Sequence, residues 1–199
     1  MYHPIFELPS ILQLPKRLFR WVLRIRHRCG YGIHSPFAFN FVCSVIYERG
    51  TFYAYADLNH QFSSQTARGL RRKDGRLLFR LANYVRPQVC SLCGVQPEGS
   101  WFDYLHAGSL HTRYEQSLCP AGLVFGDENW VDHAVELLDA VIENGVLLLP
   151  GIDRSAARRQ TWQQLLERPQ SQVSFDLGDF GIIFYRPDLQ REHYVINYF

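Results

Sequence analysis

Two neighbouring carboxylates, Asp127 and Glu128, follow an apolar run of the kind that forms a buried strand. The run spans residues 122–125, and open α/β sheets bind ligands just beyond the carboxyl ends of such strands. Asp127 is therefore a candidate catalytic and ligand-binding residue. The alternative is a structural role, because acids at the start of the following helix stabilise the positive end of its dipole.

His34 and a cysteine pair are the other residues whose types and spacing suggest chemistry. His34 stands before Ser35-Pro36, where it could orient a substrate or cap a helix through hydrogen bonds. Cys90 and Cys93 have the spacing of a zinc or redox pair, but no second such pair follows. Residues three apart on a strand also point to opposite faces, so zinc and thioredoxin-like chemistry are disfavoured.

The apolar periodicity predicts an α/β arrangement that begins at Leu77. A helical stripe starts there, and a short strand follows at residues 88–93. The run at 122–125 leads to a helix at 131–143 and then to a strand at 146–149. Strand, helix and strand at this spacing indicate a right-handed crossover and hence a parallel pair of strands.

The C-terminal region adds one more helix, predicted at residues 155–167, and three closing strands. No helix separates the closing strands, so we expect them to be antiparallel. They are predicted at residues 173–177, 181–185 and 193–198.

These patterns divide the chain into three segments. Residues 1–58 form a basic helical extension, in which an amphipathic, arginine-striped helix follows Pro15. Residues 59–76 are polar and basic with little apolar periodicity, which indicates a mobile connector. Residues 77–199 form the α/β domain.

Basic charge is concentrated toward the N-terminus. Residues 1–86 contain 14 of the 21 Lys and Arg but 4 of the 19 Asp and Glu, so their formal charge is +10 against −8 for the remainder. Nearly all of these cations are arginines, which favour bidentate pairing with carboxylate or phosphate. The acidic remainder of the chain, or of a second subunit, is the preferred partner, ahead of nucleic acid and an anionic membrane surface.

Composition favours an ordinary globular protein of 199 residues with 47% hydrophobic content. No apolar run is long enough to span a bilayer, and the N-terminal residues lack the layout of a signal peptide. We therefore expect a cytoplasmic protein. Five cysteines, an odd number, do not indicate a disulfide scaffold.

Several segments resemble a known family. The chain is similar to a bacterial group of class I S-adenosylmethionine-dependent methyltransferase-like proteins. The resemblance implies a Rossmann-like sheet with an antiparallel final strand, S-adenosylmethionine as cofactor and a small-molecule substrate. The segments that carry it are Tyr-Gly-Ile-His-Ser-Pro-Phe at 31–37, the aromatic patch at 52–55, and residues 77–84, 123–129 and 193–196.

The resemblance implies that the cofactor binds at a glycine-rich turn of the form Glu-x-Gly-x-x-x-Gly after the first strand. Glycines there let the backbone approach the methionine moiety of the ligand. Residues 91–99 correspond to this turn, so Gly94 and Gly99 are candidate cofactor-binding residues. The preceding acid is replaced by Ser91 or Leu92, and an ordinary strand-to-loop turn is the alternative.

In such folds the second strand ends in an acid that receives the ribose hydroxyls, and a helix and third strand follow. The stretch between Gly94 and Gly122 is too short for all of these elements. We therefore expect a truncated sheet. Asp103 is the best candidate for the ribose acid, with a solvated surface acid as its alternative.

The resemblance also makes Asp127 a retained acid that bears on cofactor and substrate. Metal-dependent members of the group add a later pair of acids, which aligns here with Pro150-Gly151. A family histidine near that pair aligns with Asp153, and the family histidine three residues after Asp127 is replaced by Trp130. Neither Pro150 nor Gly151 has a side-chain oxygen for a hard cation, so no metal site is expected.

Two functions follow from the resemblance. The chain is expected to be a degenerate member with weak or absent cofactor binding, acting as a partner or regulatory subunit in a homo-oligomer or beside a methyltransferase. The alternative is an active enzyme that moves a methyl group from S-adenosylmethionine to an oxygen or nitrogen of a small molecule, with Asp127 and His34 near the acceptor. An arginine-rich nucleic-acid or membrane-surface module is a third, less favoured possibility.

Overall fold

The structure is a computed structural model that describes residues 32–58 and 71–198. These residues belong to two compact units. The first unit contains residues up to Tyr84 together with Glu98–Leu110, and the second contains Val85–Pro97 and His111–Tyr198. The predicted amphipathic helix after Pro15 and residues 59–70 of the predicted connector lie outside the described residues.

The first unit is helical. Helix α2 (Pro36–Phe41) is capped by Ser35 and continues as a π-helix, η3 (Val42–Ile46), so this part of the predicted helical extension is helical. Helix α4 (Arg72–Val85) begins five residues before the predicted start at Leu77. Helix α5 (Ser100–Gly108) belongs to the same unit and lies in a stretch for which the sequence predicted no helix.

Aromatic packing holds the first unit together. The rings of Phe52, Tyr55 and Phe79 contact one another, with centroids 5.1–5.3 Å apart. Arg80 is buried and donates to the carbonyl oxygen of Val45 at the end of η3. Of the two tyrosines in the aromatic patch, Tyr55 is therefore a core residue, whereas Tyr53 is 92% exposed.

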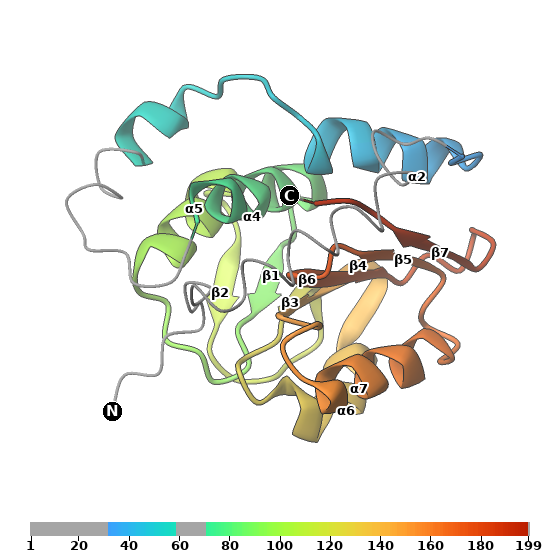
Figure 1. The fold of residues 1–199 in the computed structure, drawn as a ribbon. Helices are drawn as coiled ribbons and strands as arrows, with labels where there is room; N and C mark the ends of the chain where they lie inside the picture. The colour runs from blue at the N-terminus through green and yellow to red at the C-terminus, as the bar shows by residue number, and fades with distance from the viewer. Residues whose placement is uncertain (1–31, 59–70, 199) are drawn as a thin grey trace. The chain divides into compact units, whose positions relative to one another are not determined.

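The second unit contains a seven-stranded mixed sheet, and Figure 1 shows its strands. Their order is β2-β1-β3-β4-β6-β5-β7. In chain order they are β1 (Val89–Ser91), β2 (Arg113–Glu115), β3 (Ala121–Phe125), β4 (Val141–Pro150), β5 (Val173–Asp176), β6 (Phe180–Phe184) and β7 (Glu192–Val195).

The strand directions confirm the predicted Rossmann-like α/β fold with antiparallel C-terminal strands. Strands β2, β1, β3 and β4 are parallel, and β6 is antiparallel to both β4 and β5. One closing strand differs from the prediction, because β7 runs parallel to β5. It follows β6 along the chain but pairs on the outer side of β5, so two reversals of direction bring it back parallel to β5.

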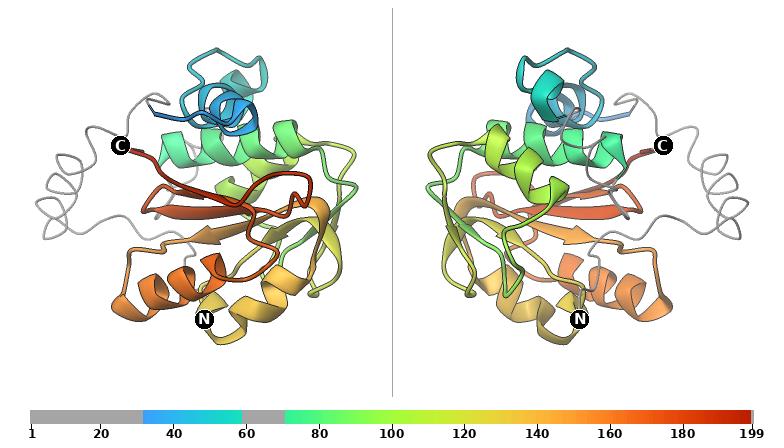
Figure 2. Two further views of the ribbon diagram at one scale, coloured as in Figure 1. Left: turned by 90° about the vertical axis from the view of Figure 1, so that its right-hand side faces the viewer. Right: turned by 90° about the vertical axis from the view of Figure 1, so that its left-hand side faces the viewer.

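Two helices pack on one face of this sheet (Figure 2). They are α6 (Ala134–Asp139), which follows a 3-10 turn η4 (Trp130–His133), and α7 (Ala156–Leu166). Trp130 and Trp162 are fully buried in the core that these helices form with β3, β4 and β6. Ser155 caps α7, as an N-terminal serine is expected to do.

The predicted helix at 131–143 is wrong at its end. Helix α6 stops at Asp139, and β4 already begins at Val141, which pairs with Ala121 of β3. Asn144 and Gly145, which directly follow the predicted helix, are hydrogen-bonded to the sheet instead. The Asn144 amide donates to the Tyr185 carbonyl at 2.8 Å, and the Tyr185 amide donates to the Gly145 carbonyl at 3.1 Å.

The stretch between β1 and β3 contains only α5 and β2. After Glu115, residues 116–120 lead directly into β3, and five residues cannot form a helix and a strand. The sheet therefore ends at β2 on this side, which agrees with the expected truncation. Among the described residues, no helix is long and apolar enough to cross a membrane.

Candidate functional site

The parallel strands of the second unit end at one edge of the sheet, where their side chains and loops form the candidate site. After β1 the chain turns through Cys93 and Gly94, whose φ values are 49° and 81°. The Leu92 amide donates to the Glu115 carbonyl at 2.8 Å, and the Gly94 amide donates to the Gln116 carbonyl, so the end of β2 fixes this turn.

The space beside Gly94 is open. A Cβ placed on this glycine would meet no atom within 4 Å, and the residue is exposed. Such a turn lets a ligand approach the backbone closely. Ser91 cannot replace the missing acid, because its hydroxyl is buried, donates to the Ser117 carbonyl at 3.0 Å and accepts from the Cys119 amide.

The acid at the end of the second strand is Glu115. It pairs in register with Ser91 of β1, and its Oε1 atom lies 2.8 Å from Nε of Arg113. Asp103, which sequence analysis selected for this position, lies in the first turn of α5 in the other unit. The sequence signal was weak, because β2 has only three residues and no apolar run.

Asp127 lies just beyond β3, as predicted, and contacts a histidine that sequence analysis did not select. Its Oδ1 atom is 3.2 Å from Nε2 of His133, and the Cys93 Sγ atom is also 3.2 Å from that nitrogen. Burial raises the pKa of Asp127, while His133, backbone amides and Arg158 act in the opposite direction. The clue to His133 was its place in the first turn after the acid pair.

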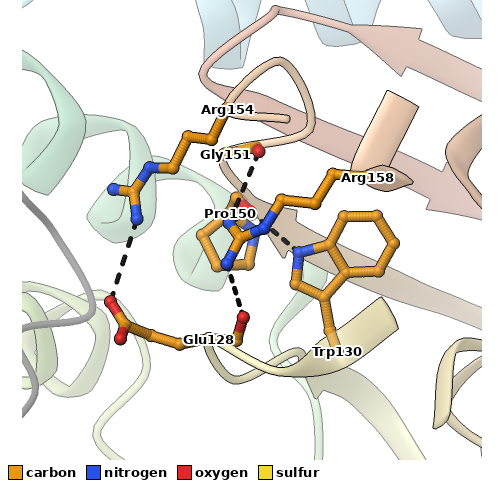
Figure 3. Close-up of polar contacts among 6 residues, drawn as sticks. All are labelled: Glu128, Trp130, Pro150, Gly151, Arg154 and Arg158. Carbon is orange, nitrogen blue, oxygen red and sulfur yellow. Dashed lines mark hydrogen bonds and ion pairs between the residues drawn. The ribbon is translucent and has the colours of Figure 1, made fainter. Parts of the chain in front are cut away.

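Arg158, from α7, joins the loops that follow β3 and β4 (Figure 3). Its guanidinium donates to the carbonyl oxygens of Pro150 at 3.2 Å, Gly151 at 3.4 Å and Glu128 at 2.5 Å. Trp130 donates from Nε1 to the same Pro150 oxygen at 2.9 Å. The backbone acceptors at the end of β4 are therefore already occupied by side chains of the chain itself.

The same region does not suit the metal that some members of the resembling group use. A guanidinium lies where Pro150 and Gly151 expose their carbonyls, and the nearby Arg154 lies 3.8 Å from the Glu128 carboxylate. In the part of the chain that the structure describes, no group of three or more His, Cys, Asp or Glu could hold a metal ion. Trp130, which replaces the family's histidine, anchors this loop rather than offering a ligand.

Three other predicted site residues, His34, Gly99 and Asp103, belong to the first unit rather than to the unit of Gly94 and Asp127. His34 is exposed ahead of α2. Gly99, with φ 86°, is the N-cap of α5. Burial raises the pKa of Asp103, and His106 opposes this effect. Their roles in a site stay predictions.

The sequence matches no protein-family model and no curated protein sequence. The SAH-bound methyltransferase PaMTH1 of Podospora anserina is similar with a TM-score of 0.50 and 11% sequence identity, over 90% of this chain and 98% of that protein. The chain has a Rossmann-like methyltransferase fold.

Two further structures resemble this methyltransferase fold at lower scores. Cofactor-bound Rv0187 from MTB has a TM-score of 0.47 at 16% identity, covering 75% of this chain and 95% of that one. A methyltransferase from Geobacter sulfurreducens has a TM-score of 0.48 at 15% identity, covering 70% and 92%. At these identities the similarity shows the fold alone, and no activity is transferred from any of the three structures.

Proposed function

We propose that this chain is a degenerate methyltransferase-like protein that does not transfer methyl groups and acts as a partner or regulatory subunit. The observation that carries the proposal is the Arg158 arrangement. Methyl transfer needs open space in which an acceptor can line up with the methyl carbon. Over β3 and β4, Arg158 and Trp130 instead take the Pro150 carbonyl at that edge, and Arg154 lies beside the Glu128 carboxylate.

Binding of S-adenosylmethionine is proposed to be weak or absent. The structural neighbour PaMTH1 is SAH-bound, which makes this class of ligand the one to test. The residues of the second unit fit it only in part. Gly94 has open space and Glu115 ends β2, but Ser91 takes the place of an acid and is hydrogen-bonded to the chain itself.

An active enzyme is the second candidate, and one observation favours it. The Asp127–His133 pair lies beside the open turn at Gly94 and could take a proton from a small-molecule oxygen or nitrogen acceptor. In that case S-adenosylmethionine would bind at Gly94 and Glu115. His34, Gly99 and Asp103 would be tested as further contributors.

Calorimetric titration with S-adenosylmethionine and with S-adenosylhomocysteine separates these functions. We expect no saturable binding. Gly94→Trp fills the open turn, and Gly32→Trp is its matched control, because Gly32 also has a positive φ of 80° and no atom within 4 Å of a built Cβ. Saturable micromolar binding that is lost in Gly94→Trp and kept in Gly32→Trp would establish the active or cofactor-binding alternative.

The partner is proposed to be a second copy of this chain or a paired methyltransferase in the cytoplasm, held in part by charge. The formal charges of +10 on residues 1–86 and −8 on the remainder favour head-to-tail pairing. Such pairing weakens as salt screens the charges. Sedimentation velocity at low and high salt is expected to show a salt-sensitive dimer, and a monomer at every salt concentration would remove self-association from the proposal.

A further inference from the structure

A thiol, an imidazole and a carboxylate meet at the carboxyl edge of the sheet, and the proposed function uses none of their reactivity. Cys93 Sγ and Asp127 Oδ1 each lie 3.2 Å from the same atom, Nε2 of His133. The three residues come from the turn after β1, the end of β3 and the 3-10 turn η4. We propose that Cys93 is a modification site that reacts with small disulfides, with His133 as its base.

Cys93 requires a base in order to react. Disulfide exchange is carried out by a thiolate, and burial together with the Asp127 charge raises the pKa of the Cys93 thiol. The free thiolate is therefore scarce near neutral pH. His133 Nε2 is within hydrogen-bonding reach of Sγ and can accept its proton during attack.

The imidazolium formed in this way has a carboxylate beside it. Asp127 Oδ1, at 3.2 Å from the same nitrogen, is a buried atom without a hydrogen-bond partner among the described residues. An opposite charge at this distance favours the protonated imidazole. Asp127 therefore stabilises His133 in the protonated form that results when it accepts the Sγ proton.

The reaction balances without a further reagent. Sγ of Cys93 forms a bond to one sulfur of the small disulfide, and the sulfur–sulfur bond of that disulfide breaks. The leaving sulfur takes the proton from His133. A thiol and a disulfide thus become a mixed disulfide and a released thiol, and excess thiol reverses the exchange.

The local backbone provides access for such a reagent. Cys93 has a left-handed φ of 49°, which is uncommon for a residue with a side chain. It is only partly buried, and the neighbouring Gly94 has open space around its Cα. The thiol thus contacts His133 while lying beside an open turn.

The chain contains its own control cysteine. Cys43 is exposed on η3 in the other unit, whereas Cys90 is buried in β1. Exposure alone would make Cys43 the fastest of these three to react. A base-assisted Cys93 would instead react faster than Cys43 although it is less exposed.

The test treats the full chain with oxidised glutathione near neutral pH and measures the modification of each cysteine over time by mass spectrometry. We expect Cys93 to react about tenfold faster than Cys43, and His133→Gln to lower the Cys93 rate about tenfold without changing Cys43. His111→Gln is the matched control, because His111 is an exposed histidine away from the cluster.

Two results would overturn the proposal: a Cys93 rate no higher than that of Cys43, or a Cys93 rate unchanged by His133→Gln. Unfolding of the variant would be recognised by modification of the buried Cys90. His133→Asn is then the second variant, and the ratio of the Cys93 and Cys43 rates in the unmodified sequence decides if both variants unfold.

Discussion

The two halves of the carboxyl edge in the second unit differ in what occupies them. Over β1 and β2, Gly94 leaves open space and β2 ends in the partly exposed Glu115. Over β3 and β4, Arg158 and Trp130 donate to the Pro150 carbonyl at the end of β4, and Arg158 also donates to the Glu128 carbonyl in the loop after β3. A sheet can therefore keep the topology of a ligand-binding fold while side chains of the protein occupy the backbone acceptors along half of its edge.

The half of the edge over β3 and β4, called the closed half below, depends on residues that are far apart in the sequence. Pro150 supplies an acceptor at the end of β4, Trp130 donates to it from η4, and Arg158 donates to it from α7. The guanidinium also binds the Glu128 carbonyl, so one side chain ties the two loops together. If the closed half is part of the folded core, substitutions of its residues should lower the unfolding free energy more than substitutions in the open half over β1 and β2.

The largest effect is expected for Trp130→Ala. Trp130 is fully buried, and removal of such a side chain leaves a cavity that costs about 4 kcal/mol of unfolding free energy. Trp130→Phe keeps most of the volume and loses the hydrogen bond to Pro150, at about 1 kcal/mol. Urea unfolding measures both, and equal losses in the two variants would show that packing at Trp130 does not hold this half together.

Arg158→Ala should lower the unfolding free energy by about 2 kcal/mol, because three backbone acceptors lose a charged donor. Arg154→Ala, in the loop that precedes α7, is the matched control. Arg154 lies 3.8 Å from the Glu128 carboxylate, and a partly exposed pair of this kind contributes about 0–1 kcal/mol. Similar losses in the two variants, measured by the same unfolding experiment, would contradict the account of Arg158.

Alanine substitutions at two glycines, one in each half, compare how tightly the two halves are packed. Alanine at Gly126 would bring a Cβ to 2.7 Å from Leu149 and 3.2 Å from Trp130, an overpacking that costs about 2 kcal/mol. Alanine at Gly94 meets no atom within 4 Å and carries only the left-handed backbone strain of about 1 kcal/mol. Thermal unfolding of both variants should show the larger loss for Gly126→Ala, and the reverse order would mean that the two halves have been assigned the wrong way round.

The smallest effect concerns the acid at the boundary of the two halves. The folded pKa of Asp127 is raised mainly by burial, so the folded state binds its proton more tightly than the unfolded state does. Stability therefore falls as pH rises from about 4 through the folded pKa. Asp127→Asn should remove this loss of stability. From pH 3.5 to pH 7, the unfolding free energy of the variant should therefore rise by less than about 1 kcal/mol relative to that of the unchanged chain.

Asp188→Asn is the control of opposite sign for this pH dependence. Hydrogen bonds from Arg186 lower the pKa of the exposed Asp188 carboxyl. This variant should therefore lose relative stability as pH rises from 3.5 to 7. Urea unfolding at the two pH values checks both, and a change of the same sign in both variants would contradict the assignment of Asp127.

Sequence patterns predicted the α/β fold well where buried runs are long. The run at 122–125 and the helix capped by Ser155 are both present in the structure. They missed β2, because a three-residue edge strand has no apolar signal, and Glu115 was missed with it. They also placed the end of α6 too late, because Val141 is fixed by pairing with Ala121, a partner distant in sequence.

The candidate site was predictable only in part. Asp127 was found because it follows a buried strand, and Gly94 because the resemblance implies a glycine-rich turn after the first strand; both relations are local in sequence. His133, Cys93 and Arg158 acquire their contacts from folding, since their partners lie 6 to 40 residues away. Neither charge nor spacing indicates that an arginine of α7 takes the acceptors at the end of β4.

Hydrogen–deuterium exchange with and without excess S-adenosylmethionine tests the closed half most directly. We expect amides of residues 127–133 and 150–158 to exchange at the same rate in both conditions, because side chains of the protein occupy that half of the edge. Any weak binding would slow exchange only at residues 92–97. Ligand-dependent protection of residues 127–133 and 150–158 would contradict it and show that this half still receives a ligand.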